Sequence, residues 1–246
     1  MSSSLKVMKG EWLKTIPFLA SVTYYYILFI PFDSPSVWAT FIRILPMLGN
    51  IAFVLLYGVG SKDEYIYTRR ILTGLTFSMV ADAIIVWPDY FLVAMVPFGI
   101  AHMFYTKAFG LNKLNVKAGV ALFATAAVLA SKILPGTTGV FTVGVVLYII
   151  CIVTMLWAVT SRLISSGKNR TWTEIVSCFG GYSFAVSDAF IAFDKFVAPI
   201  ANAQMIIITT YYFAQFAMAL SVAGTSSTRK PVQKKQREEL KSKKNK

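Results

Sequence analysis

Several residue types on which familiar active sites depend are scarce in this sequence. Its 246 residues include one histidine, which excludes a zinc site built on three histidines. A Ser-His-Asp hydrolase would have to use His102, but the sequence has no G-x-S-x-G elbow, the motif that presents the serine of many hydrolases. The two cysteines, Cys151 and Cys178, fall inside predicted helices, which excludes a disulfide framework. A retinal pigment needs a lysine in mid-helix, and the lysines here lie in predicted loops or near helix ends.

Charge is also scarce, and apolar residues take its place. Hydrophobic residues make up 56% of the chain and charged residues 14%, which is far from the balance of a soluble domain. Windows of about 19 residues predict eight helices, each long enough to cross a bilayer. We therefore expect an all-α polytopic membrane protein. The predicted helices cover 13–31, 37–59, 69–88, 90–110, 116–134, 138–160, 172–194 and 200–223.

The basic residues predict how these helices are oriented. Of the 24 Lys and Arg residues, only Arg43, Lys132 and Lys195 fall outside five segments that an eight-helix arrangement places on one side. Because short loops rich in Lys and Arg stay on the cytoplasmic side, both termini are expected in the cytoplasm. The net charge of +13 is spread over these loops and a tail, which favours contact with anionic lipids and not with nucleic acid.

The end of the sequence differs in composition from the rest. Residues 1–226 form the predicted eight-helix domain, and 227–246 form a basic cytoplasmic tail. The tail closes with KSKKNK, whose third and fourth residues from the end match the dilysine signal that returns membrane proteins to the endoplasmic reticulum. The expected location is therefore the endoplasmic reticulum membrane, although a basic tail can also be a solvated run of charge.

Ionisable residues inside the predicted helices mark the candidate site. Each costs at least roughly 2.5–3.5 kcal/mol in a bilayer, so such residues usually face a cavity or a partner. With about 1.5 Å of rise per residue, Asp82 and Asp188 lie at nearly the same depth. Arg43 and Gln204 reach a similar level, and His102 lies a turn or two deeper. Two acids with an arginine suit acid–base chemistry, whereas an Asp–Arg pair can also simply clamp helices together.

An internal repeat relates the two aspartates. A shift of 106 residues aligns Asp82-Ala83 with Asp188-Ala189, Gly74 with Gly180 and Tyr105 with Tyr211. A four-plus-four duplication keeps the same orientation in both halves and makes the two carboxyl groups counterparts across a pseudo-two-fold axis.

Two long stretches resemble the signature regions of the YhhN-like lysoplasmalogenase family. They are GLTFSMVADAIIVWPDYFLVAMVPFGIAHMFYTKAFG and GGYSFAVSDAFIAFDKFVAPIANAQMIIITTYYFAQFAMALS. The specific parts are the two Asp-Ala motifs and two further motifs, Ala101-His102-x-x-Tyr105 and Tyr211-Tyr212-x-Ala214-Gln215. A third element, RILPML, resembles the family pattern K-x-L-P with Arg43 in place of the lysine. The similarity spans essentially all eight predicted helices.

The resemblance implies cleavage of the vinyl ether bond of a lysoplasmalogen, which gives a fatty aldehyde and a glycerophospho-ethanolamine or -choline. A vinyl ether is hydrolysed by protonation of its β-carbon, and water then captures the oxocarbenium ion. Asp82 and Asp188 are expected to be the acid and the charge-stabilising base, in an order left open, and no metal or organic cofactor is needed. The residues expected to bind substrate are Arg43, His102, Tyr105, Gln204, Tyr211, Tyr212 and Gln215.

Two other functions would use the same residues. A proton-coupled transporter or lipid flippase would cycle protons on the two acids during alternating access. A lipid-sensing or scaffold protein would keep the acids as clamps between helices, so that replacing them by Asn should unfold it. Product chemistry separates the enzyme from the transporter, because only the enzyme releases free aldehyde.

Overall fold

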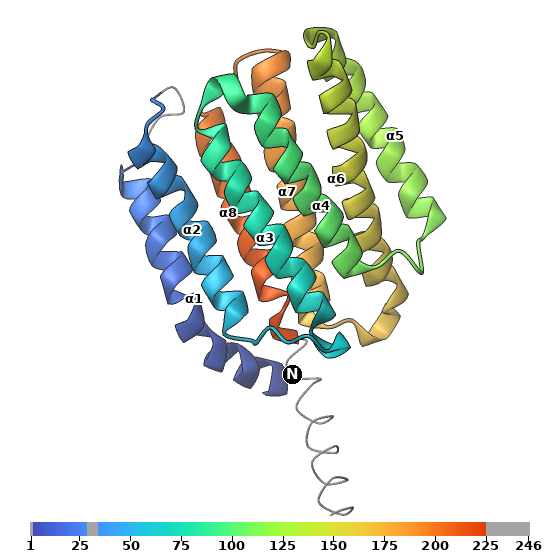
Figure 1. Cartoon of the computed structure of the whole chain (residues 1–246). Helices are drawn as coiled ribbons and strands as arrows, with labels where there is room; N and C mark the ends of the chain where they lie inside the picture. The colour runs from blue at the N-terminus through green and yellow to red at the C-terminus, as the bar shows by residue number, and fades with distance from the viewer. Residues whose placement is uncertain (1, 29–33, 225–246) are drawn as a thin grey trace, which may run out of the picture.

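Helices account for all the secondary structure in the part of the chain that the computed structural model describes, residues 2–28 and 34–224. This confirms the predicted all-α fold. Figure 1 shows a bundle of long helices that run up and down beside one another. They are α1 (Ser2–Leu28), α2 (Val37–Leu55), α3 (Ile66–Ile85), α4 (Phe91–Phe109), α5 (Val116–Ile133), α6 (Val140–Ser165), α7 (Trp172–Phe196) and α8 (Ala203–Leu220). The basic segment 227–246, with its expected retrieval signal, lies outside the described residues.

Side-chain caps and turn residues set the helix ends. The Ser36 side chain accepts a hydrogen bond from the Ala39 N–H at the start of α2, and Asn115 does the same for α5. Thr171 and Glu174 form a capping box at the start of α7. At the end of α4, Gly110 has a φ of 89°, a conformation that a side chain would disfavour. The start of α2, α5 and α7 and the end of α4 therefore each have a local cause in the sequence.

The helix bounds differ from the predicted ones where polar sequence continues a helix or proline stops it. Helix α1 already begins at Ser2, and α6 runs on to Ser165, because backbone hydrogen bonding does not need apolar side chains. Helix α3 ends at Ile85, before the predicted residue 88, where Trp87-Pro88 opens a short 3₁₀ turn, Pro88–Tyr90. Hydropathy windows locate the apolar core of a helix and miss such extensions.

Helices that follow one another in the chain pack as neighbours, with α4 and α5 as the exception. The closest pairs are α3 with α4 and α7 with α8. Helix α8 returns to pack against α2 and α3, and α4 packs against α6, so the two halves of the chain share one core. Helix α5 lies at the edge of the bundle, where α6 is its main partner (Figure 1).

The bundle is apolar outside and carries polar groups inside, as expected of a protein in lipid. Large apolar side chains such as Val96 and Val120 are more than 60% exposed, whereas Arg43, Asp82 and His102 are buried. Among the residues that the structure describes, six helical segments are long and apolar enough to span a membrane, which supports a multi-pass membrane protein. Helices α1 and α3 are not among the six. Arg69, Arg70 and Asp82 make α3 more polar than those six segments.

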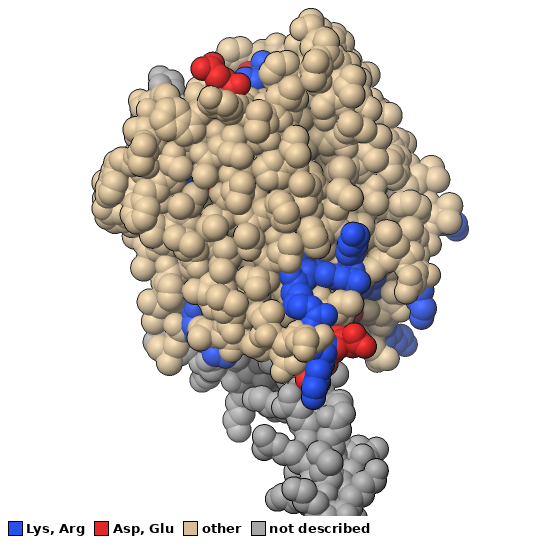
Figure 2. Space-filling model, viewed as in Figure 1, with Lys and Arg blue, Asp and Glu red and all other residues tan. Residues whose placement is uncertain are grey.

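The charged side chains are distributed unequally between the two ends of the bundle. The loops 56–65, 110–115 and 166–171 lie at the end where α1 begins, and they and the adjoining helix turns carry most of the basic residues. In Figure 2, Lys and Arg gather over the lower part of the visible face, which is this end. We refer to it as the basic end, and to the other as the opposite end.

Candidate functional site

Asp82 lies in the fully buried core, where it is part of an ion pair. The Arg43 Nε of α2 lies 3.3 Å from Asp82 Oδ1, and the Tyr211 hydroxyl of α8 donates a hydrogen bond to Asp82 Oδ2. The Asp82 side chain has no exposed surface and that of Arg43 is 8% exposed. Three helices, α2, α3 and α8, are therefore joined at one carboxyl group.

The neighbours of this pair include two more of the predicted residues. The Tyr212 hydroxyl donates a hydrogen bond of 2.9 Å to the backbone carbonyl of Arg43, so α8 hydrogen-bonds to α2 as well as to α3. The Tyr25 ring packs edge-on against Tyr212 with centroids 5.3 Å apart, and Gln204 hydrogen-bonds to Tyr25. Gln204 thus belongs to the surroundings of Asp82, in agreement with its predicted depth.

Tyr105 and Gln215 form a second buried layer, one turn nearer the basic end. The Tyr105 hydroxyl donates to Gln215 Oε1 at 2.8 Å, and both side chains have no exposed surface. The Tyr105 ring lies against Gly74 of α3, where a Cβ atom would come within 2.3 Å of the ring. The absence of a side chain at Gly74 is therefore what admits this ring between α3 and α8.

Asp188 occupies a different environment on α7. The Tyr148 hydroxyl of α6 donates a hydrogen bond of 2.8 Å to Asp188 Oδ2, and His102 Nε2 lies 3.5 Å from the same oxygen. The Tyr148 hydroxyl and His102 Nε2 are also within hydrogen-bonding distance of each other, at 3.1 Å. The three side chains, which we call the Asp188 cluster, come from α4, α6 and α7 and form a closed triangle of polar atoms.

An aromatic ring separates the two carboxyl groups. Phe184, one turn before Asp188, has no exposed surface and contacts both sides. Its ring centroid lies 4.6 Å from that of His102 and 5.5 Å from that of Tyr211. Within the described residues, no hydrogen bond or ion pair joins Asp82 to Asp188. The two acids are linked instead through packing, from Asp82 to Tyr211, Phe184, His102 and Asp188.

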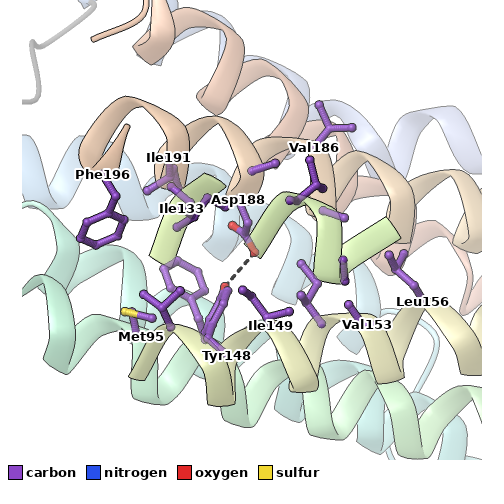
Figure 3. A pocket seen from close by; sticks show the side chains of 18 of the residues that line it. Met95, Ile133, Tyr148, Ile149, Val153, Leu156, Val186, Asp188, Ile191 and Phe196 are labelled. Carbon is purple, nitrogen blue, oxygen red and sulfur yellow. Dashed lines mark hydrogen bonds between the residues drawn. The ribbon is translucent and has the colours of Figure 1, made fainter. Parts of the chain in front are cut away.

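Asp188 borders a cavity whose lining does not include Asp82. The cavity has a volume of about 340 Å³ and is lined by α4, α5, α6 and α7 with one residue of α3. Figure 3 shows Asp188 and Tyr148 in its middle, joined by their hydrogen bond, with Phe196 towards one end and Leu156 towards the other. Apolar side chains make up nearly all of its remaining wall. The Asp188 side chain keeps 15% of its surface exposed, whereas Asp82 keeps none.

The structure thus brings the predicted site residues together in two groups. Arg43, Asp82, Gln204, Tyr211 and Tyr212 surround one acid, with Tyr105 and Gln215 beside them, whereas only His102 joins Asp188. The sequence analysis missed Tyr148, which contacts both members of the second group. A signal for it was present, because it is the sole tyrosine in the apolar run VVLYII, eight residues after the start of α6.

Comparisons with known proteins agree with this architecture. A sequence model of the YhhN family matches residues 38–222. The chain is 34% identical to "Lysoplasmalogenase TMEM86A" of Homo sapiens over 95% of its own length and 97% of the relative's. It is 31% identical to "Lysoplasmalogenase TMEM86B" of Sus scrofa over 90% of both chains. No solved structure matches. The family match and these full-length relatives show that the chain belongs to the YhhN family.

Proposed function

We propose that this protein is a lysoplasmalogenase, an ether hydrolase that cleaves the vinyl ether bond of 1-alkenyl glycerophosphoethanolamine or -choline. The observation that carries the proposal is the Asp188 cluster, a carboxyl group with two proton-carrying partners at the wall of an apolar cavity. The names of the relatives support the same activity.

The cavity suits the apolar part of such a substrate. Its volume of about 340 Å³ falls in the usual range for small-molecule sites, and its walls are almost entirely aliphatic and aromatic. An alkenyl chain lying along α6 and α7 gains by burial against these walls, and its vinyl ether then lies beside Asp188. A polar group at one point of an apolar channel fixes where the reactive bond stops.

The Asp188 cluster can carry out the proton transfers that vinyl ether hydrolysis needs. A protonated Asp188 gives its proton to the β-carbon, which leaves an oxocarbenium ion on the ether side and a carboxylate on the enzyme. That carboxylate stabilises the cation and then accepts a proton from the attacking water. The hemiacetal collapses to the aldehyde and the glycerol hydroxyl, so one water is consumed and the acid is restored.

Tyr148 and His102 support this sequence as positioning residues. Both approach Asp188 Oδ2, at 2.8 Å and 3.5 Å, and so direct the other carboxyl oxygen, Oδ1, towards the cavity. The Tyr148 hydroxyl and His102 Nε2 also lie 3.1 Å apart. Asp188, Tyr148 and His102 therefore form one hydrogen-bonded group. Such a linked group keeps Asp188 in one orientation while it gives up its proton and takes one back.

Asp82 acts in this proposal through its neighbours and not at the reacting bond. It holds Tyr211, whose ring packs on Phe184, which in turn packs on His102. Arg43 fixes the charge and direction of Asp82. The two aspartates therefore contribute unequally. Asp188 lies at the reacting bond, whereas Asp82 holds the aromatic side chains that pack behind His102.

The same proposal includes the finer points of topology. We take all eight helices as membrane-spanning, with both termini in the cytoplasm of a cell and the protein in the endoplasmic reticulum membrane. The repeat is supported by Gly74 and Gly180, which are counterparts in the shifted alignment. Each lies where its helix meets the next one: a Cβ at Gly180 would come within 2.7 Å of Ala217 Cβ, as one at Gly74 would meet Tyr105.

Aldehyde release from purified protein tests the function. The substrate is a 1-alkenyl lysophosphoethanolamine in detergent micelles, beside the acyl and the saturated alkyl ether compounds of equal chain length. We expect one aldehyde per glycerophosphoethanolamine from the vinyl ether and no product from the other two. Fatty acid from the acyl compound would indicate an esterase. Movement of lysolipid across vesicles in response to a proton gradient, without aldehyde, would indicate the transporter that uses the same acids.

A further inference from the structure

The cavity ends beside a lysine at the opposite end of the bundle. Phe91 of α4 and Phe196 of α7 line the cavity there, and their rings meet edge to face with centroids 6.1 Å apart. The ammonium group of Lys195 lies 4.5 Å from the centroid of the Phe91 ring. Figure 3 shows Phe196 at this end of the cavity. An otherwise apolar channel therefore has a cation at its rim.

Helical register places this cation in line with the reactive carboxyl group. Asp188, Ile191 and Ala192 line the cavity from α7, and Lys195 continues the same spacing, seven residues after Asp188. Seven residues are nearly two full turns, so the two side chains leave the same side of the helix. At about 1.5 Å per residue, their Cα atoms are roughly 10 Å apart along the axis.

A lysine at this place also has ordinary structural contacts. A cation in the last turn of a helix is favoured by the helix dipole, and the Phe91 ring attracts it as well. The neighbouring acid, Asp194, uses its Oδ1 atom to accept a hydrogen bond from the Ile200 N–H at 2.7 Å. A ring on one side of an ammonium group leaves its N–H donors on the other side for an anion.

We propose that Lys195 binds the phosphate of the lysophospholipid substrate. This inference rests on the proposed function, because it takes Asp188 as the place of the vinyl ether. Five bonds separate the ether oxygen from phosphorus, a span of roughly 6 Å, and a lysine side chain has a similar reach. Together they bridge the roughly 10 Å between Asp188 and Lys195. The headgroup then lies at the cavity rim while the alkenyl chain extends inward towards Leu156.

The position of the phosphate at Lys195 also determines from which leaflet the enzyme takes its substrate. The phosphate lies at the opposite end, away from the loops that carry most of the basic residues. In the proposed orientation, that end faces the non-cytoplasmic leaflet. The basic loops and the substrate phosphate therefore contact different leaflets of the membrane.

Two substrates that differ only in the phosphate test the proposal. Hydrolysis of a 1-alkenyl lysophosphoethanolamine and of the corresponding 1-alkenylglycerol is measured in the same mixed micelles with wild type and Lys195→Gln. We expect KM for the phospholipid to rise about tenfold, the loss of one charge-assisted contact, with kcat within about twofold. Neither constant should change for the alkenylglycerol. Lys195→Arg should restore most of the phospholipid KM, and Lys132→Gln, the matched control at the end of α5, should leave both substrates unaffected.

Two results would overturn the assignment of Lys195. Equal losses on both substrates would indicate a purely structural lysine, and no loss on either would place the phosphate elsewhere. If wild type releases no aldehyde at all, the proposed function fails, and binding decides the phosphate question separately. Displacement of a fluorescent lysolipid by the saturated alkyl lysophospholipid and by the alkylglycerol then shows whether the preference for phosphate disappears in Lys195→Gln. A preference that persists in that variant refutes the site.

Discussion

The two aspartates of this protein share the same Asp-Ala motif but have opposite surroundings. Asp82 faces a guanidinium group and a tyrosine hydroxyl in a region without exposed surface. Asp188 faces a tyrosine and the single histidine, and it borders a cavity. A carboxyl group with a fixed cation suits a permanent ion pair, whereas one with two proton-carrying neighbours suits proton exchange. Position in a helix alone therefore does not define the role of an intramembrane acid.

The hydrogen-bonding partners of the two acids also differ from what the 106-residue shift predicts. In the shifted alignment Tyr105 is the counterpart of Tyr211, which donates to Asp82. Tyr105 does not repeat that contact with Asp188 and donates to Gln215 instead. The partners of Asp188 come from α4 and α6, so each acid is served partly by the other half of the chain. Positions that the shifted alignment pairs therefore carry chemically different contacts in the two halves of the chain.

The largest effect is expected at Asp188. Asp188→Asn keeps the shape of the side chain and its hydrogen bond from Tyr148 but removes the transferable proton. Turnover should fall by on the order of 10²–10⁴, the usual contribution of a general acid. The free energy of unfolding should change by no more than about 1 kcal/mol, since no buried charge loses its partner. Aldehyde release and the unfolding midpoint in detergent measure the two quantities.

Tyr148→Phe should have a smaller effect on turnover than Asp188→Asn. It keeps the aromatic ring and removes only the hydroxyl that donates to Asp188 Oδ2. We expect about a tenfold loss of turnover, between wild type and Asp188→Asn, from the misdirected carboxyl group. If Asp188→Asn retains near-normal turnover as a folded protein, the assignment of the acid is wrong.

A large effect of a different kind is expected at Asp82. Asp82→Asn leaves the Arg43 guanidinium buried without its counter-charge, which should lower the free energy of unfolding by about 3–5 kcal/mol. Turnover per folded molecule should fall less than in Asp188→Asn, because Asp82 acts through Tyr211 and Phe184. Titration with a tight-binding alkyl lysolipid gives the number of folded molecules, and turnover is then expressed per folded molecule.

The double variant Arg43→Gln with Asp82→Asn is the control for this reading. It removes both charges and should recover part of the stability lost in Asp82→Asn, since no buried charge is left unpaired. A folded Asp82→Asn protein whose turnover drops as far as that of Asp188→Asn would restore the sequence-based prediction of two equal carboxyl groups.

The sequence predicted the fold and one of the two groupings well. Apolar runs located all eight helices, and the depth estimate placed Arg43, Asp82 and Gln204 near one another. It could not separate Asp188 from Asp82, because rise per residue gives depth but not rotation about the bundle axis. The separation depends on Phe184, whose apolar side chain carries no sign of a special role. The cavity was equally hidden, since it depends on how α4, α5, α6 and α7 lie against one another.

Helix ends show the same limit on a smaller scale. Hydropathy could not extend α1 to Ser2 or α6 to Ser165, because the residues concerned are polar while their backbone remains helical. By contrast, Trp87-Pro88 was a readable stop for α3, since proline disfavours a helical residue before it. Local chemistry can thus be read from the chain, whereas contacts between distant segments need the structure.

The smallest effect should come from a single methyl group on the Asp82 side. In Gly74→Ala the new Cβ would come within 2.3 Å of the Tyr105 ring, which must shift and weaken its hydrogen bond to Gln215. Overpacking of this kind costs about 1–3 kcal/mol of unfolding free energy. Gly99→Ala is the matched control on α4, because nothing lies within 4 Å of a Cβ there. It should be neutral or stabilise the protein by up to about 1 kcal/mol.

The same pair of variants sharpens the comparison between the two acids. Tyr105 belongs to the buried layer next to Asp82 and does not line the cavity. Gly74→Ala should therefore lower the unfolding midpoint while KM for the lysoplasmalogen stays within about twofold of wild type, because the cavity walls are unchanged. A rise in KM at unchanged stability would instead place Tyr105 against the substrate, as the sequence analysis expected, and would join the two regions into one site.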